Sequence, residues 1–190
     1  MSAEDLMIEG IESLTEGNYS EALNNFRKAL EIDQNLPECN YYKGLTHQLL
    51  NQFEISLESF DIEIQLNPKH INSFIAKGTS LCLLSQKEKG LEEYNKALDL
   101  EPNNIQALTN KSIVLQDLNN INEALECINK LIEIDNNNYM PYLTKANILA
   151  QNEQYEDAIN NYKILALPNN TSNKFGLINS ASSKYLLAWV

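Results

Sequence analysis

The residue types that most often carry enzyme or metal chemistry are few and scattered in this chain. It holds two histidines, His47 and His70, and three cysteines, Cys39, Cys82 and Cys127. No zinc-type spacing, glycine-rich phosphate loop or nucleophile elbow occurs, and no acid or cysteine is spaced to partner His70. The sequence therefore predicts no catalytic activity, no cofactor and no metal site. The odd, scattered cysteines are expected to be small hydrophobic residues in a reducing compartment.

Lysine recurs at a fixed interval of 34 residues, at Lys43, Lys77, Lys111 and Lys145. We expect a surface ladder in which these lysines pair with acidic residues between repeats, such as Glu31, Asp33, Glu101 and Asp135. Exposed pairs of this kind contribute only about 0–1 kcal/mol. The series thus indicates a repeated structure rather than a reactive site.

The charge of the chain limits its partners. Its net charge is -12, divided as -9 in residues 1–70, -4 in 71–138 and +1 in 139–190. Nucleic acids and anionic membranes both attract basic surfaces, so neither is an expected partner. The acidic start, MSAEDLMIEG, lacks the apolar core of a signal peptide, and no apolar run is long enough for a membrane span. A cytoplasmic location is expected.

Small residues keep the same 34-residue interval and locate the elements. Gly10, Gly44, Gly78, Ser112 and Ala146 form one series, and Ala22, Ser56, Gly90, Ala124 and Ala158 follow twelve residues behind. The interval predicts five repeats over 3–36, 37–70, 71–104, 105–138 and 139–172. Within each repeat the apolar residues recur at helical spacing, and polar breaks such as 16–18 and 119–120 divide it in two.

Each repeat is therefore expected to be a hairpin of two amphipathic helices in an all-α fold. One hairpin cannot bury its apolar face alone, so stacked hairpins are needed to build a continuous core. The small residues, such as Gly10 beside Ala22, let the two helices of a hairpin approach closely. Larger residues, such as Phe26 and Phe60, fill the seams.

The pattern resembles the tetratricopeptide repeat (TPR) family over residues 3–172. The first repeat carries the family's glycine, its Gly-Asn-Tyr turn, and its Ala, Phe and Ala in order, while Pro68 and Pro102 occupy the family's terminal proline position. Lys87 departs from the pattern, because it replaces the aromatic that usually begins the second helix. The resemblance implies a right-handed α-solenoid of antiparallel hairpins and places His47 in the core of a first helix.

The register slips after the fifth repeat, where Pro168 arrives early. Residues 173–190 read as a last amphipathic helix, with Phe175, Ile178, Tyr185 and Trp189 on one face. Solenoids need such a helix to cover the final seam, so we expect a C-terminal cap. The alternative is a surface for self-association through Tyr185, Leu186, Leu187 and Trp189, which would make a homodimer.

In the resembled family, first helices line a concave groove that binds peptides. The positions carried over to this chain are Met7, Ile11, Tyr41, Leu45, Ile75, Thr79, Cys82, Thr109, Ile113, Gln116, Leu143 and Asn147. The family's carboxylate clamp, which holds the Glu-Glu-Val-Asp tail of chaperones, needs lysines, asparagines and an arginine. At the matching positions this chain has no cation, so that tail is not an expected partner.

The sequence thus predicts a non-catalytic scaffold that binds a protein or peptide in its groove. An apolar strip with acidic surroundings favours a basic amphipathic segment, and Tyr41 is the expected anchor. Two alternatives stay open. One is a structural module that self-associates, and the other is a regulatory partner of a separate enzyme.

Overall fold

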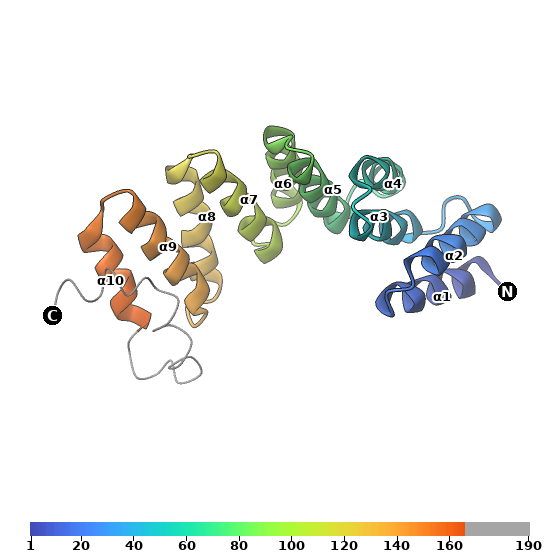
Figure 1. Cartoon of the computed structure of the whole chain (residues 1–190), viewed down its shortest axis with the longest axis horizontal. Coiled ribbons are helices and arrows are strands. Elements are labelled where there is room, and N and C mark those ends of the chain that lie inside the picture. Colours follow the sequence, from blue (N-terminus) through green and yellow to red (C-terminus); the bar gives the residue numbers. More distant parts are fainter. Residues whose placement is uncertain (166–190) are drawn as a thin grey trace. The chain divides into compact units, whose positions relative to one another are not determined.

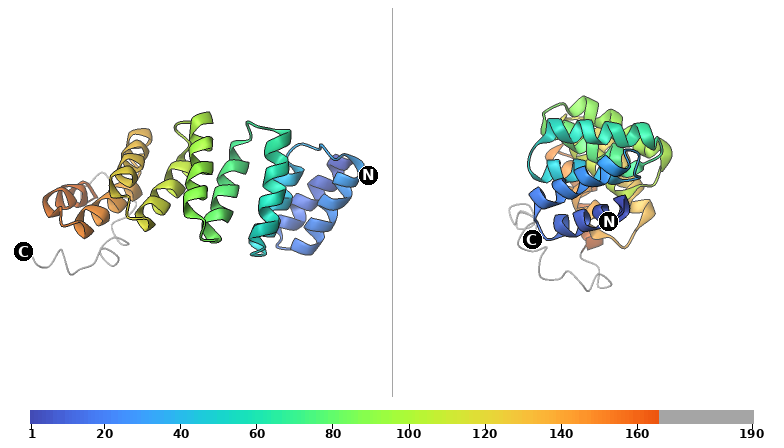
Figure 2. Two further views of the ribbon diagram at one scale, coloured as in Figure 1. Left: turned by 90° about the horizontal axis from the view of Figure 1, so that it is seen from above. Right: turned by 90° about the vertical axis from the view of Figure 1, so that its right-hand side faces the viewer.

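The computed structural model describes residues 1–165, and over this range the chain forms ten α-helices and no β-strand (Figures 1 and 2). The helices are α1 (Ala3–Thr15), α2 (Tyr19–Ile32), α3 (Cys39–Leu49), α4 (Phe53–Leu66), α5 (Ile71–Leu83), α6 (Lys87–Leu100), α7 (Ile105–Asp117), α8 (Ile121–Ile134), α9 (Tyr139–Gln151) and α10 (Tyr155–Leu165). The all-α fold is thereby confirmed. The segments predicted as the C-terminal cap and the self-association surface lie outside the described residues. No described helix has the length and apolar character that a membrane crossing requires.

Every first helix ends in the same left-handed turn. The turn residues have positive φ: Gly17 (81°), Asn51 (58°), Ser85 (62°), Asn119 (60°) and Glu153 (62°). The next N–H then donates to a carbonyl five residues back, as from Gln86 to Leu81 at 2.8 Å. This hydrogen bond satisfies a carbonyl at the helix end that would otherwise lack a donor. It explains why the polar breaks of the sequence fall at these positions.

Helix α3 begins two residues later in its repeat than the other first helices do. Glu38 has a left-handed backbone (φ 64°), and its N–H donates to the carboxylate Oε1 of Glu63 at 3.1 Å. Glu63 lies on α4 and is almost fully buried, at the position where the first and third repeats have Ala29 and Ala97. A carboxylate at the start of a helix stabilises the unpaired N–H groups there.

Inside each of the first three hairpins, a glycine of the first helix lies under an aromatic ring of the second. A Cβ on Gly44 would come 2.5 Å from Phe60, and one on Gly10 would come 2.6 Å from Phe26. The three atoms nearest to such a Cβ on Gly10 all belong to the ring of Phe26. Gly78 meets both partners, because its Cβ would lie 2.7 Å from Tyr94 and 3.0 Å from the carbonyl of Gly90.

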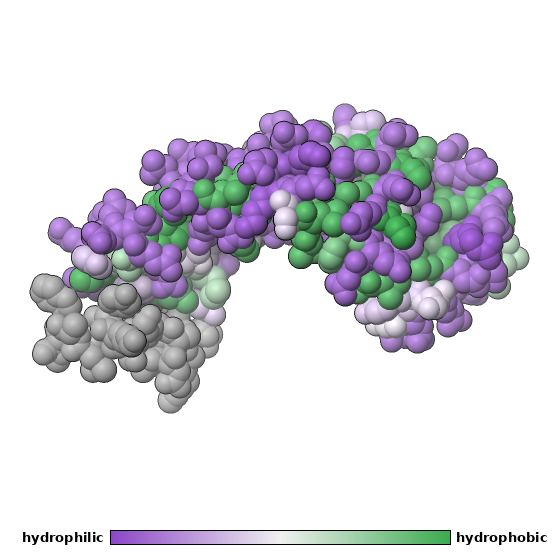
Figure 3. Space-filling view, turned by 45° about the horizontal axis from the view of Figure 1, so that its top comes forward, coloured by the Kyte–Doolittle hydropathy of each residue, from purple (hydrophilic) through white to green (hydrophobic). Residues whose placement is uncertain are grey.

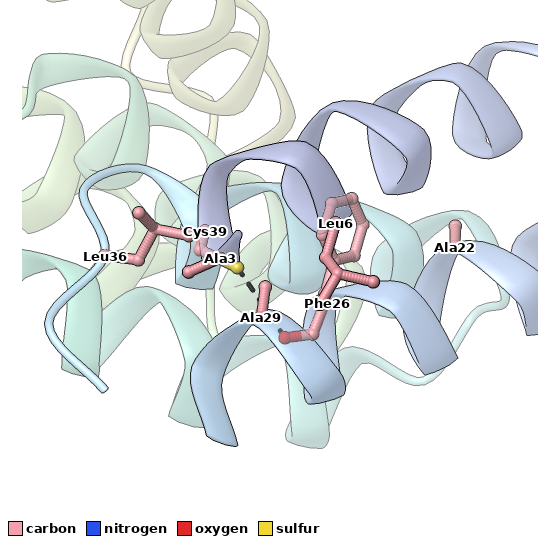
Figure 4. Packing of buried hydrophobic residues seen from close by; sticks show 7 residues of the cluster. All are labelled: Ala3, Leu6, Ala22, Phe26, Ala29, Leu36 and Cys39. Carbon is pink, nitrogen blue, oxygen red and sulfur yellow. Dashed lines mark hydrogen bonds between the residues drawn. The ribbon is translucent and has the colours of Figure 1, made fainter. Parts of the chain in front are cut away.

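Successive hairpins share their cores. Figure 4 shows the first of these clusters, in which residues of α1 and α2 meet Leu36 and Cys39 at the start of the second hairpin. The Cys39 thiol lies 3.7 Å from the carbonyl oxygen of Phe26. A second cluster joins α5, α6 and α7 around Tyr94 and Ala107. Stacking therefore buries the faces that a single hairpin leaves open.

The chain divides into two compact units, which are described separately. The first unit, residues 1–127, holds α1 to α7 and the start of α8. In the second unit, which begins at Ile128, α9 and α10 pack as a hairpin. There the Tyr162 hydroxyl donates to Asn147 Oδ1 at 2.6 Å, and Ala146 is fully buried.

The lysine series has a different geometry from the expected ladder. Lys77 Nζ lies 2.7 Å from Asp61 on the preceding α4 and 3.1 Å from Glu93 on α6 of its own repeat. Lys145 donates to Asn129, again sixteen residues earlier, at 2.7 Å. The expected partners at the repeat ends were wrong for these two lysines. The side chain of Lys77 crosses a seam between helices and meets the second helix of the previous repeat.

Candidate functional site

The first helices form a shared surface within the first unit. Helix α1 contacts α3, α3 contacts α5, and α5 contacts α7, whereas α2, α4 and α6 make no contact with one another. Helices that touch only through one member of each hairpin are closer together on that side. The exposed faces of α1, α3, α5 and α7 are therefore the inner side of the unit, a surface that several repeats share.

Large apolar side chains are exposed on this inner side. Leu49 and Leu83 are each 55% exposed and Ile113 is 52% exposed, while Leu45 is half-buried one turn before Leu49. We call these four residues the first-helix strip. Figure 3 shows one face of the molecule, in which hydrophobic residues lie between hydrophilic ones over the first unit. Leu49 and Leu83 were absent from the predicted groove, although both follow a predicted residue (Leu45 and Thr79) by one helical turn.

Tyr41, the predicted anchor, is half-buried at a junction of helices. Its ring lies 6.2 Å from Phe60 on α4 and 4.9 Å from His70, which precedes α5, between ring centroids. A third ring, Tyr42, is 5.2 Å away. Burial raises the pKa of the Tyr41 hydroxyl, with smaller contributions from Tyr42 and Glu38. Tyr41 thus supports the seam between the second and third hairpins, and only part of its ring faces outward.

Ile75 requires a correction. It is only 2% exposed and belongs to the core cluster that contains Tyr94 and Val114. The prediction that Ile75 lines the groove was therefore wrong. The neighbouring first helix α7 covers this position in α5, so the exposed face of α5 lies toward Thr79 and Leu83 instead.

Thr79 and Cys82 face a polar junction between three helices. The Thr79 hydroxyl lies 3.1 Å from the Tyr94 hydroxyl and accepts from Asn110 Nδ2 at 3.4 Å. Burial raises the pKa of the Cys82 thiol, while a hydrogen bond with Tyr94 and the charge of Lys87 oppose the rise. A thiol that is held protonated is a poor nucleophile. Both side chains are half-buried and link α5 to its neighbours.

The remaining predicted residues lie at different depths. Met7 and Ile11 are half-buried against the first core cluster, and Gln116 and Leu143 are also half-buried. Thr109 on α7 is exposed, and so is Asn147 on α9, which belongs to the second unit. The structure therefore brings Leu45 and Ile113 together with the newly found leucines on one unit. It places Asn147 on the second unit.

The histidines have local structural partners. His47 is half-buried rather than part of the core, and its Nδ1 lies 2.8 Å from Gln52 Oε1. His70 Nδ1 lies 2.7 Å from the Ser73 hydroxyl at the start of α5. Among residues 1–165, no three His, Cys, Asp or Glu side chains gather as metal ligands would.

Exposed acidic side chains lie at the ends of three first helices of the first unit. Glu4 and Glu38 are exposed at the start of α1 and α3, and Asp117 is exposed at the end of α7. Asp117 accepts from Lys87 Nζ at 2.9 Å, so its charge is partly compensated. Lys77, the lysine of α5, is drawn away from the strip by Asp61 and Glu93.

Two stretches of the chain match family models. Residues 14–51 match a model described as TPR repeat, and residues 105–138 match one described as Tetratricopeptide repeat. The second match coincides with the fourth predicted repeat. Together with the stacked helical hairpins, these matches identify the repeats. The chain contains tetratricopeptide repeats.

Solved structures agree with this TPR fold. MamA (residues 41 to the end) from Desulfovibrio magneticus RS-1 is 17% identical with a TM-score of 0.78, covering 90% of this chain and 97% of that one. YrrB, described as a TPR protein with an unusual peptide-binding site, is 19% identical with a TM-score of 0.71, covering 96% and 89%. The first TPR of Spaghetti, bound to the HSP90 peptide SRMEEVD, is 23% identical with a TM-score of 0.60, covering 62% and 93%. No curated protein matches the TPR chain in sequence.

Proposed function

We propose that this chain is a non-catalytic scaffold that binds a peptide or an amphipathic helix along the inner side of its first unit. The observation that carries the proposal is the first-helix strip, in which three adjacent first helices expose large apolar side chains. Isolated exposed leucines are common on proteins, but Leu49 and Leu83 occupy equivalent positions in consecutive repeats. Such a row is suited to the regularly spaced apolar residues of a helix.

The partner's charge follows from the charges on the first helices of this unit. Glu4, Glu38 and Asp117 are exposed at helix ends, whereas Lys77 of α5 pairs with Asp61 and Glu93 on second helices. We therefore propose a segment with Lys or Arg flanking its apolar face, rather than an acidic tail like that bound by the Spaghetti domain. YrrB has an unusual peptide-binding site and the Spaghetti domain binds an HSP90 peptide, and both are consistent with this use of the fold.

The test is a binding titration with a library of labelled amphipathic peptides, from which the tightest basic binder is taken forward. Leu49→Glu with Leu83→Glu should weaken that binder by tenfold or more, because apolar contacts are replaced by hydrated charge. Ile32→Glu is the control, since Ile32 is also an exposed large apolar residue (60% exposed) but lies on α2. Equal losses for the two variants, or no loss for the first, would place the binding surface elsewhere.

The structural alternative has its own supporting observation. Tyr155 and Ile159 on α10 are exposed apolar residues in the second unit. If the chain is a self-associating module, light scattering should give the mass of a dimer in the absence of any partner. A monomer at micromolar concentration would favour the scaffold function.

A further inference from the structure

The outer side of α4 departs from the pattern of the other repeats. The position of Ile55 holds Glu21, Lys89, Glu123 and Asp157 in the other four repeats. The position of Ile62 holds Lys28, Lys96 and Lys130 in the first, third and fourth repeats, and Ile164 in the fifth. Stacking in a solenoid imposes the same environment on equivalent positions, so packing does not require isoleucine at these two.

These isoleucines form a continuous apolar line with a third residue. Ile55 is 44% exposed, Ile62 is 42% exposed and Leu66 is 40% exposed. Spacings of seven and four residues place all three on one side of the helix. The buried side of α4 is formed by other residues, namely Ser56, Ser59, Phe60 and Glu63. We call Ile55, Ile62 and Leu66 the outer stripe.

The charges on α4 are all negative. The helix contains four acidic residues and no lysine or arginine. Glu63 is buried beneath the start of α3, and Asp61 is paired with Lys77. The exposed, uncompensated carboxylates beside the stripe are those of Glu54 and Glu58.

The replaced lysine matters for Glu58 in particular. In α6 and α8 the equivalent glutamates, Glu92 and Glu126, have a lysine four residues later, so a positive charge lies one helical turn away. In α6 this lysine, Lys96, pairs with the buried Glu93 rather than with Glu92. In α4 the same position is Ile62, so the substitution creates apolar surface and also removes the positive charge that would lie one turn from Glu58.

We propose that the outer stripe is a second docking surface, which receives an amphipathic helix with Lys or Arg beside its apolar residues. Such a helix replaces the missing lysine charge opposite Glu54 and Glu58 while its apolar face covers the stripe. A second copy of this chain is a poorer occupant. Two outer stripes that meet face to face would bring the uncompensated carboxylates of both copies together. This surface lies on a second helix and is independent of the first-helix strip.

The probe is a designed fourteen-residue helical peptide of leucine and lysine, labelled with a fluorophore, with a leucine and glutamate version as its charge-reversed control. The protein carries Leu49→Glu and Leu83→Glu in every arm, so that the first-helix strip does not contribute. In this background Ile55→Glu with Ile62→Lys should reduce the affinity for the lysine peptide at least tenfold. These residues are native at the same positions of other repeats, so the fold and the melting temperature should not change.

Lys28→Ala, at the position equivalent to Ile62 on α2, is the matched control and should leave the affinity within twofold. The glutamate peptide should bind at least tenfold more weakly than the lysine peptide. Equal affinity of the stripe variant and its parent would overturn the proposal. Equal affinity for the two peptides would overturn the basic partner. A dimer of the unaltered chain that the stripe substitutions dissociate would instead assign the surface to a second copy.

Discussion

At the scale of single residues, the left-handed turn after each first helix is filled by four different residue types in the five repeats. Gly17 adopts its positive φ without steric cost, whereas Ser85 and Glu153 carry a Cβ in the same conformation. Asparagine, at Asn51 and Asn119, is an intermediate case because its side chain tolerates this region. The sequence shows the turns clearly but not which of them are strained.

Ser85→Gly should therefore stabilise the first unit. Relief of the left-handed strain is worth about 1 kcal/mol, although the added freedom of the unfolded chain offsets part of it. Urea denaturation followed by circular dichroism measures the change. Gly17→Ala should destabilise by about 1 kcal/mol, and Asn51→Gly should change little. A loss of stability in Ser85→Gly would mean that the serine side chain contributes more than its backbone costs.

Gly44→Ala should destabilise the second hairpin by about 1–3 kcal/mol, because the new methyl group overlaps the fully buried Phe60 ring. In a Phe60→Leu background the same substitution should cost clearly less, since the smaller side chain vacates the overlap. Equal costs in the two backgrounds would show that the glycine is needed for another reason. A double-mutant cycle measured by chemical denaturation separates the cases.

At the scale of helices, Lys77 joins α4, α5 and α6. Burial disfavours its charged form, but the hydrogen bond to Asp61 and the charge of Glu93 outweigh this, so the pKa of Lys77 is raised. A raised lysine pKa stabilises the folded state at pH values below the ordinary lysine pKa. That stabilisation is lost as the pH rises through the raised value. The seam should therefore weaken only in strongly alkaline solution.

Lys77→Met should cost about 1–3 kcal/mol, because it leaves the buried Glu93 carboxylate with only the exposed Lys96 as a counter-charge. Lys87→Met provides the comparison. Its pair with Asp117 is more exposed and should contribute less than about 1 kcal/mol. Thermal and urea unfolding of both variants test the ranking, and the reverse order would refute it.

The helices were predictable because the 34-residue interval imposes the same hairpin at every repeat. The face that each first helix exposes was less predictable. The groove positions of the resembled family predict that Tyr41, Leu45 and Ile75 line the groove. The structure instead buries Ile75 and exposes Leu49. Burial at such positions depends on how neighbouring first helices approach one another. The partners of Lys77 were missed for the same reason, since they come from two different helices.

At the scale of the whole molecule, the second unit leaves Tyr155 and Ile159 exposed on its last described helix. If residues 173–190 act as the predicted cap, their deletion should lower the melting temperature and the solubility. Differential scanning calorimetry and light scattering measure both. An unchanged melting temperature with a clean monomer would mean that this segment serves a partner instead. A dimer that becomes a monomer on deletion would support self-association.

A buried cysteine at the seam between the first and second hairpins reports how often that seam opens. Cys39 is fully buried there, and burial together with the charge of Glu63 raises the pKa of its thiol to about 12, against the opposing charge of Lys43. Thiol reagents attack only an accessible thiolate, so at pH 8 Cys39 should react only while α2 and α3 are apart. The rate at which Cys39 is alkylated, followed by mass spectrometry, then measures how often this seam opens, with no engineered probe in the chain. Cys82, which is half-buried, should react first. Ligands that bridge the first two repeats should lower the rate at which Cys39 is alkylated.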